Sequence, residues 1–249
     1  MSHHNLRDIG GIATQSGQFI KKNHIFRSAN TDTLRMKDVR YLESLNIETI
    51  VDLRPVSEQK RKKHPPSLPH ITTIPIAISE KTKKRLKPYF FKKNSKEKIT
   101  EIVNSIYREM VHNFKPQVQR IFKLLLHPEK YPFLIHCRAG KDRTGFIISL
   151  ILLLLNVDKQ VIIQDYLSSN DFIIPYARRI LIPLKIVTFG FFPSHNLETV
   201  LAVQPLYIQT IFETIEKEYN GINGYLETCG ISKTEQEQLI AILLDTPAI

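Results

Sequence analysis

The sequence of 249 residues has little of what several classes of protein require. It contains only two cysteines, Cys137 and Cys229, which fit neither a disulfide framework nor a zinc site. A reducing compartment agrees with this cysteine content. No cluster of aspartate or histidine has the spacing of metal ligands, so we expect neither a metal ion nor another cofactor.

Long apolar runs are also missing. The first residues, MSHHNLRDIGG, contain no apolar core of the kind that a signal peptide needs. The longest apolar run, residues 145–157, is shorter than the roughly 18 to 20 residues of a membrane span, and a buried core helix is the better interpretation. The default expectation is therefore a cytoplasmic protein, and export without a classical signal peptide stays open.

Acidic residues are too few to balance the basic ones. The chain has 35 lysines and arginines against 24 acidic residues, a formal net charge of +11, and the excess gathers between Lys60 and Lys98. Blocks of like charge are typical of a solvated loop, but they also attract anionic substrates or an anionic membrane surface. No nucleic-acid motif accompanies the charge, so we expect no nucleic-acid partner.

Length and composition are those of an ordinary globular protein. The apolar fraction is 42% and the charged fraction 24%, and the sequence shows no repeats or low-complexity segments. We expect one domain over residues 1–249, with residues 60–98 as a basic insert or lid-like segment within it.

Apolar patterning predicts an α/β domain whose central, mostly parallel sheet is flanked by helices, with a helical C-terminal part. Runs rich in Ile, Val, Phe and Thr predict strands, and helical apolar spacing predicts the helices. The expected strands are 24–29, 47–55, 71–78 and 131–137, and the expected helices are 31–46, 99–126, 142–156, 158–168, 205–219 and 233–244.

Residues 134–145, LIHCRAGKDRTG, lead from a buried strand into a helix. Residues 137–141 must therefore form a loop at a helix N-terminus, where free N–H groups and the helix dipole favour anions. Gly140 allows backbone angles that turn successive N–H groups inward, and Arg143 adds a fork of donors suited to phosphate. The loop is predicted to bind a phosphate group.

Cys137 begins this loop, where the same field favours a thiolate over a thiol. A thiolate that faces a bound phosphate is a nucleophile in line with phosphorus. The alternative is a buried structural cysteine, which leaves the spacing of Gly140 and Arg143 unexplained. Cys229 lies near an expected helix end and is predicted to be a packing residue.

Residues 136–144 match the His-Cys-x5-Arg-Ser/Thr signature of cysteine-dependent phosphatases. In its HCxAGKDRTG form, this stretch resembles the bacterial tyrosine-phosphatase family that includes mycobacterial and listerial secreted enzymes able to act on phosphotyrosine and phosphoinositides. Further blocks that resemble the family are 7–11, 26–28, 51–54, 165–170 and 203–243. The least similar part is 60–98.

The resemblance implies a cysteine-dependent phosphatase fold and a phosphocysteine mechanism on phosphotyrosine proteins, phosphoinositides or both. Cys137 would attack phosphorus, and water would then hydrolyse the intermediate. His136 would orient the loop, and Thr144 would hydrogen-bond the sulfur. The phosphate-binding groups would be the N–H groups of Arg138, Ala139, Gly140, Lys141, Asp142 and Arg143, together with the Arg143 guanidinium.

The leaving oxygen needs a proton from a general acid, and no aspartate occurs between Asp52 and Asp142. Asp52 ends a strand, where the carboxyl ends of parallel strands meet the ligand, but it could instead form an ion pair with Arg54. Asp142 lies in the loop, or it could serve only to stabilise the helix N-terminus. We favour Asp52 as the acid from its expected position.

Lys141 adds a second cation within the loop, which suits a substrate that carries more than one phosphate. Arg7, Asp8 and Arg27 could scaffold the pocket or form purely structural ion pairs.

Two other classes of function compete with an enzyme of this kind. A catalytically idle relative could bind phosphorylated ligands, although Cys137, Arg143 and Thr144 are all present. Redox or sulfur-transfer chemistry on the same loop lacks a second cysteine placed to resolve an intermediate.

Overall fold

The structure, a computed structural model, describes residues 3–32, 34, 36–59, 71–79, 85–89, 92, 94–187 and 199–245. Its centre is a five-stranded sheet in the order β1-β2-β5-β3-β4. The strands are β1 (Arg7–Asp8), β2 (Ile25–Ser28), β3 (Thr49–Asp52), β4 (Thr72–Pro75) and β5 (Phe133–His136). β1 pairs antiparallel with β2 and the other pairings are parallel, which confirms the predicted mostly parallel sheet.

The strand register brings three chain segments to one edge of the sheet. His136, the last residue of β5, pairs with Ser28 of β2 on one side and Asp52 of β3 on the other. The loop after β5 therefore leaves the middle of the sheet at the carboxyl ends of its parallel strands. In sheets of this type, that edge is where ligands bind.

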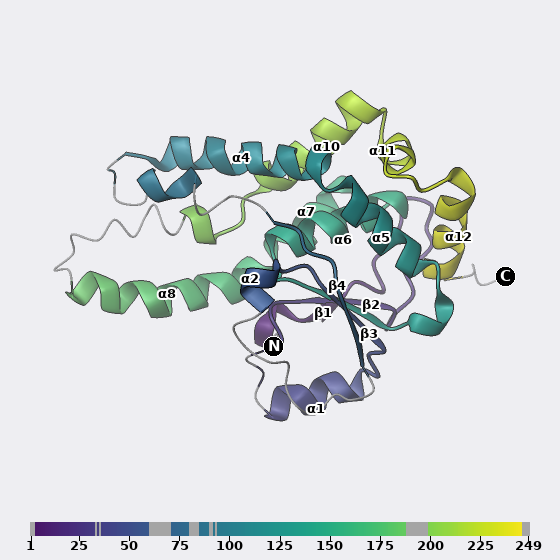
Figure 1. Cartoon of the computed structure of the whole chain (residues 1–249), viewed down its shortest axis with the longest axis horizontal. Helices are drawn as coiled ribbons and strands as arrows, with labels where there is room; N and C mark the ends of the chain where they lie inside the picture. The colour runs from purple at the N-terminus through teal and green to yellow at the C-terminus, as the bar shows by residue number, and fades with distance from the viewer. Residues whose placement is uncertain are drawn as a thin grey trace.

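Helices cover both faces of the sheet, so β2, β3 and β5 are buried along their whole length. On one face α1 packs over a small apolar cluster that includes Leu42 and Ile50. On the other face the larger core gathers most of the remaining helices, as Figure 1 shows. The helices are α1 (Met36–Ser44), α2 (Val56–Gln59), α4 (Lys96–Asn113), α5 (Lys115–Leu125), α6 (Asp142–Leu154), α7 (Lys159–Leu167), α8 (Asn170–Val187), α10 (Pro205–Tyr219), α11 (Ile222–Thr228) and α12 (Lys233–Leu243), with short 3₁₀ turns at His3–Asn5, Lys87–Tyr89 and Pro128–Lys130.

The apolar run GFIISLILLLLNV forms most of α6, which is the buried central helix that the sequence predicts. Almost every residue of α6 is buried, including its first-turn residues Arg143 and Thr144. Among the described residues, no helix has both the length and the apolar character that crossing a membrane requires.

The expectation of a single helix over 99–126 is wrong, because the chain forms two helices there. α4 ends at Asn113 and α5 begins at Lys115, with Pro116 in the first turn of α5. Proline has no N–H to donate to the carbonyl of residue 112, and its ring clashes with that carbonyl. The helix therefore stops and restarts at Phe114, which caps both pieces.

α8 is not among the helices that apolar spacing predicts, since Pro175 and Pro183 interrupt its sequence. The basic segment 60–98 is described only in part. Residues 60–70, 80–84, 90, 91 and 93 lie outside the described residues, and the role predicted for this segment stays a prediction. In its described part, Arg85 forms an ion pair with Glu109 of α4 at 2.6 Å, and Leu86 is buried.

Candidate active site

The loop of residues 137–141 joins β5 to α6, and its first residue, Cys137, is only 2% exposed. Gly140 adopts a φ of +68°, a region that side chains disfavour. A Cβ at this position would also lie 2.4 Å from the carbonyl oxygen of Ser28. Only glycine therefore allows the loop to turn this closely against the end of β2.

Three successive carbonyl groups of the loop accept hydrogen bonds from residues outside it. The pairs are Asn30 N with Arg138 O (3.2 Å), Asn5 Nδ2 with Ala139 O (3.2 Å) and with Gly140 O (3.0 Å), and Arg27 Nη2 with Gly140 O (2.9 Å). In a planar trans peptide, C=O and N–H point in opposite directions. The N–H groups of residues 139, 140 and 141 therefore point away from these donors, as an anion-binding nest requires.

Asp165 of α7 holds the arginines behind the loop. Its carboxylate accepts from Arg7 Nε at 2.7 Å and from Arg27 Nη1 at 2.5 Å. Burial raises the pKa of Asp165, but the charges of Arg27 and Arg7 and their hydrogen bonds outweigh it, so the pKa lies below its ordinary value. Asp165 is thus an ionised buried group. Asp8 instead accepts from the backbone N–H of Gly10 and stabilises a turn.

Arg143 lies in the first turn of α6 and is 6% exposed. Its Nη2 is 3.1 Å from Glu58 Oε2, so α2 contributes a carboxylate to the first turn of α6. Lys141 Nζ donates to the carbonyl groups of Val200 (2.9 Å) and Leu201 (2.8 Å) just before α10. Lys141 therefore ties the loop to a distant part of the chain as well as adding a positive charge.

Asp52, the first candidate for the acid, is 1% exposed and bound by Arg54. Arg54 Nε is 2.9 Å from Asp52 Oδ1 and Nη2 is 2.8 Å from Oδ2, while Nη1 reaches Asp32 at 2.5 Å. Burial raises the pKa of Asp52, but hydrogen bonds from Arg54 and the charges of His136 and Arg54 lower it below its ordinary value. This geometry favours the ion-pair interpretation of Asp52.

Asp142, the second candidate, is partly exposed, with 31% of its side chain accessible. Its Oδ1 accepts a hydrogen bond from Tyr107 at 2.5 Å, and its Oδ2 is 3.6 Å from Lys141 Nζ. Asp142 is the first residue of α6 and directly follows the loop.

The two supporting residues of the motif are fully buried. His136 Nδ1 donates to the carbonyl of Cys137 at 3.2 Å, and Nε2 is 3.8 Å from Asp52 Oδ1, which links the loop to β3. Within the described part of the chain, the hydroxyl of Thr144 meets no hydrogen-bond partner. Cys229 is buried far along the chain, and burial raises its pKa to about 11, as expected of a packing residue.

The structure adds residues that the sequence did not indicate. Asn5, Glu58 and Tyr107 contact the loop or its first helical turn, and Asp165 acts through Arg27, which contacts the loop. Only the Asp-Tyr-Leu-Ser-Ser-Asn block that contains Asp165 carried any sequence signal, and it came without a role.

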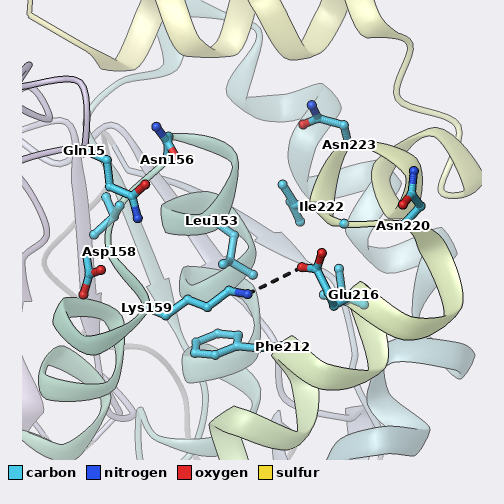
Figure 2. Close-up of a pocket in the computed structure, with 13 residues that line it drawn as sticks. Gln15, Leu153, Asn156, Asp158, Lys159, Phe212, Glu216, Asn220, Ile222 and Asn223 are labelled. Carbon is cyan, nitrogen blue, oxygen red and sulfur yellow. Dashed lines mark hydrogen bonds and ion pairs between the residues drawn. The ribbon is translucent and has the colours of Figure 1, made fainter.

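A separate hollow lies at the opposite end of α6, with a volume of about 520 Å³ (Figure 2). Leu153 and Phe212 contribute apolar walls, and a Lys159–Glu216 ion pair at 3.5 Å spans its side. α6 has 13 residues, so this hollow is separated from the loop by the helix length of about 20 Å. It is not part of the candidate active site.

Comparison with known proteins places this site in context. The chain is 28% identical to the triple specificity protein phosphatase PtpB of Mycobacterium tuberculosis, over 96% of each chain. It is 34% identical to a tyrosine-protein phosphatase of Nostoc commune over 27% of this chain and 23% of that one. The core catalytic domain of the PP-IP phosphatase SIW14 from S. cerevisiae has a TM-score of 0.41 and 19% identity, covering 78% of this chain and 97% of that one. The model of the tyrosine phosphatase family matches residues 1–245, and the chain therefore belongs to this family of cysteine-based phosphatases.

Proposed function

We propose that the chain hydrolyses phosphate monoesters, phosphotyrosine first among them, through a phosphocysteine intermediate on Cys137. The observation that carries this proposal is the orientation of the loop. Its carbonyl groups are bonded from behind by Asn5, Asn30 and Arg27, which leaves three successive N–H groups directed inward beside Cys137. Arg143 follows in the first helical turn and supplies the guanidinium.

The reaction has two steps. The Cys137 thiolate attacks phosphorus, the bond from phosphorus to the leaving oxygen breaks, and that oxygen takes a proton from a carboxylic acid. Water then attacks the phosphocysteine, gives its proton to the same carboxylate, and the phosphorus–sulfur bond breaks to release phosphate and regenerate the thiolate. The inward N–H groups and Arg143 stabilise charge on the phosphoryl oxygens in both steps.

We propose Asp142 rather than Asp52 as the acid, contrary to the expectation from the sequence. Asp52 is buried, and Arg54 binds both of its oxygens, so it is held as a carboxylate with no proton to donate. Asp142 is partly exposed and adjoins the loop. Asp142→Asn should lower kcat by roughly 10²-fold or more on a substrate whose leaving group needs a proton. The same loss in Asp52→Asn, with Asp142→Asn near normal, would transfer the role.

Turnover of a simple aryl phosphate tests the proposed chemistry. We expect activity that is abolished in Cys137→Ser, inhibited by vanadate and unchanged by chelators. Phosphate binding without turnover would instead identify a binding module. Activity that disappears with a chelator and returns with a divalent ion would contradict the phosphocysteine mechanism.

We further propose that phosphoinositides are a second substrate class. Carbonyl contacts do not neutralise the ammonium of Lys141, so this residue still places positive charge beside Asp142 and the loop. The net charge of +11 supports substrates of high negative charge and contact with an anionic membrane surface. A panel of phosphotyrosine peptide, phosphoserine peptide and phosphoinositide measures this preference directly.

A further inference from the structure

Two buried tyrosines from separate helices connect to Asp142. Tyr107 of α4 donates its hydroxyl hydrogen to Asp142 Oδ1 at 2.5 Å, and its oxygen lies 2.6 Å from the hydroxyl oxygen of Tyr166 in α7. Tyr107 has one hydroxyl hydrogen, which the bond to Asp142 uses. Tyr166 must therefore donate to Tyr107, and the three groups form a directed chain from Tyr166 through Tyr107 to Asp142.

We propose that Tyr107, held by Tyr166, is a positioning residue that fixes which oxygen of Asp142 carries the catalytic proton. This inference rests on the proposed role of Asp142 as the acid. While Tyr107 donates to Oδ1, that oxygen accepts, and the proton of the neutral acid is placed on Oδ2, because a proton on Oδ1 would require the hydroxyl hydrogens of both tyrosines to reverse direction. Oδ2 is the oxygen 3.6 Å from Nζ of Lys141, a residue of the loop.

The same contact serves both chemical steps. When Asp142 gives its proton to the leaving oxygen, Oδ1 keeps its hydrogen bond, so the carboxylate does not rotate. In the second step, Oδ2 then accepts the proton of the attacking water. A fixed carboxyl group avoids a reorientation between the two transfers, which is how preorganised groups contribute to catalysis.

The two tyrosines are buried, and a buried hydroxyl group needs a hydrogen-bond partner that a packed apolar side chain does not need. Tyr107 and Tyr166 are each 1% exposed, and phenylalanine would fill the same volume without a polar group to satisfy. Burial first, and then the charge of Asp142, raises the pKa of both tyrosines well above 10.0. Both hydroxyls therefore stay protonated and able to donate over the working range of a phosphatase.

The experiment compares aryl phosphates that differ in how much their leaving group needs a proton. Dinitrophenyl phosphate releases a stable phenolate, whereas phenyl phosphate depends on the acid. In Tyr107→Phe we expect kcat/KM to fall by about 10-fold on phenyl phosphate, a part of the roughly 10²- to 10⁴-fold that general acid catalysis contributes, and to stay near the parent value on dinitrophenyl phosphate. Tyr166→Phe should show a smaller loss of the same kind.

Tyr225→Phe is the matched control, because Tyr225 is also fully buried and donates to a carbonyl, that of Val111 at 2.9 Å, away from the loop. It should leave the dependence on the leaving group unchanged. A loss in Tyr107→Phe that is equal on both substrates, or no loss on either, would overturn the proposal. If Tyr107→Phe does not fold, Tyr166→Phe and its leaving-group dependence decide the question alone.

Failure of the inference can be told apart from failure of the proposed function. If Cys137→Ser keeps its activity, the phosphocysteine mechanism is wrong. If Cys137→Ser is inactive but Asp142→Asn loses no more on phenyl than on dinitrophenyl phosphate, the acid lies elsewhere and the role of Tyr107 is overturned with it. If Asp142→Asn shows the dependence and Tyr107→Phe does not, only the positioning role is overturned.

Discussion

Asp165 is the residue on which the arginines behind the loop depend. Asparagine at this position would keep the size and shape of the side chain but would leave Arg27, which is 1% exposed, without a carboxylate partner. Removing one partner of a buried ion pair costs about 3 to 5 kcal/mol. Asp165→Asn should therefore lower the free energy of unfolding at pH 7 by an amount of this order. Glu213→Gln, which breaks an exposed pair with Lys217, should cost no more than about 1 kcal/mol.

The pH dependence gives a second measurement on the same variant. The pKa of Asp165 is lower in the folded protein than its ordinary value of 3.8. A lowered pKa means that the stabilisation is complete above about pH 4 and is lost as the pH falls through the folded-state pKa. Denaturant unfolding should therefore show that the difference in free energy of unfolding between the parent and Asp165→Asn becomes smaller below pH 4. A difference that stays constant would contradict this assignment.

At the scale of single residues, the sequence indicates what lies in one contiguous motif. Cys137 and Arg143 could be identified because their spacing alone defines the loop. Asn5 and Asp165 could not, because they act through contacts to residues 135 and 158 positions away in the chain. The expectation that Asp52 is the acid depended on its place at a strand end, and the sequence does not show that Arg54 binds both of its oxygens.

The loop itself is the element most sensitive to a small change. Gly140→Ala would place a methyl group 2.4 Å from the Ser28 carbonyl oxygen, in addition to the strain of a positive φ. We expect kcat/KM for an aryl phosphate to fall by about 10²-fold, since a displacement near 1 Å can cost this much. Gly17 is the control, because its φ is +81° but a Cβ there would meet nothing within 4 Å.

Gly17→Ala should therefore show the backbone strain alone, with a loss of about 1 kcal/mol in stability and unchanged kcat/KM. Thermal unfolding and aryl phosphate kinetics of the two variants separate these effects. Equal activity in Gly140→Ala and the parent would show that the loop does not need its close approach to β2.

The apolar pattern of the sequence predicts a strand or helix correctly where a single local preference determines that element. The four expected strands and the buried helix α6 are confirmed. β2, β3, β5 and α6 are buried, which leaves nearly continuous apolar runs, whereas β4 is mostly exposed and was indicated by its isoleucine and threonine residues. β1, with two residues, is too short to show an alternation. α8 contains two prolines, which local preference disfavours inside a helix, so its sequence did not indicate it.

At the scale of the whole molecule, the net charge of +11 should act on encounter with substrate. The screening length falls from about 30 Å at 0.01 M salt to about 3 Å at 1 M, so attraction of anions weakens steeply with salt. We expect kcat/KM to decline with NaCl more steeply for a phosphotyrosine peptide with acidic flanks than for one with basic flanks, while kcat is little affected. Equal slopes for the two peptides would contradict steering by the protein's charge.

The bonds behind the loop also set an order in time. Gly140 O is bonded by Asn5 and Arg27, and Arg27 is in turn held by Asp165, which follows the loop along the chain. Synthesis from the N-terminus delivers Asn5, Arg27 and the whole loop before it delivers α7. A nascent chain on the ribosome therefore carries the complete motif for some time before it can hold that motif in its working shape.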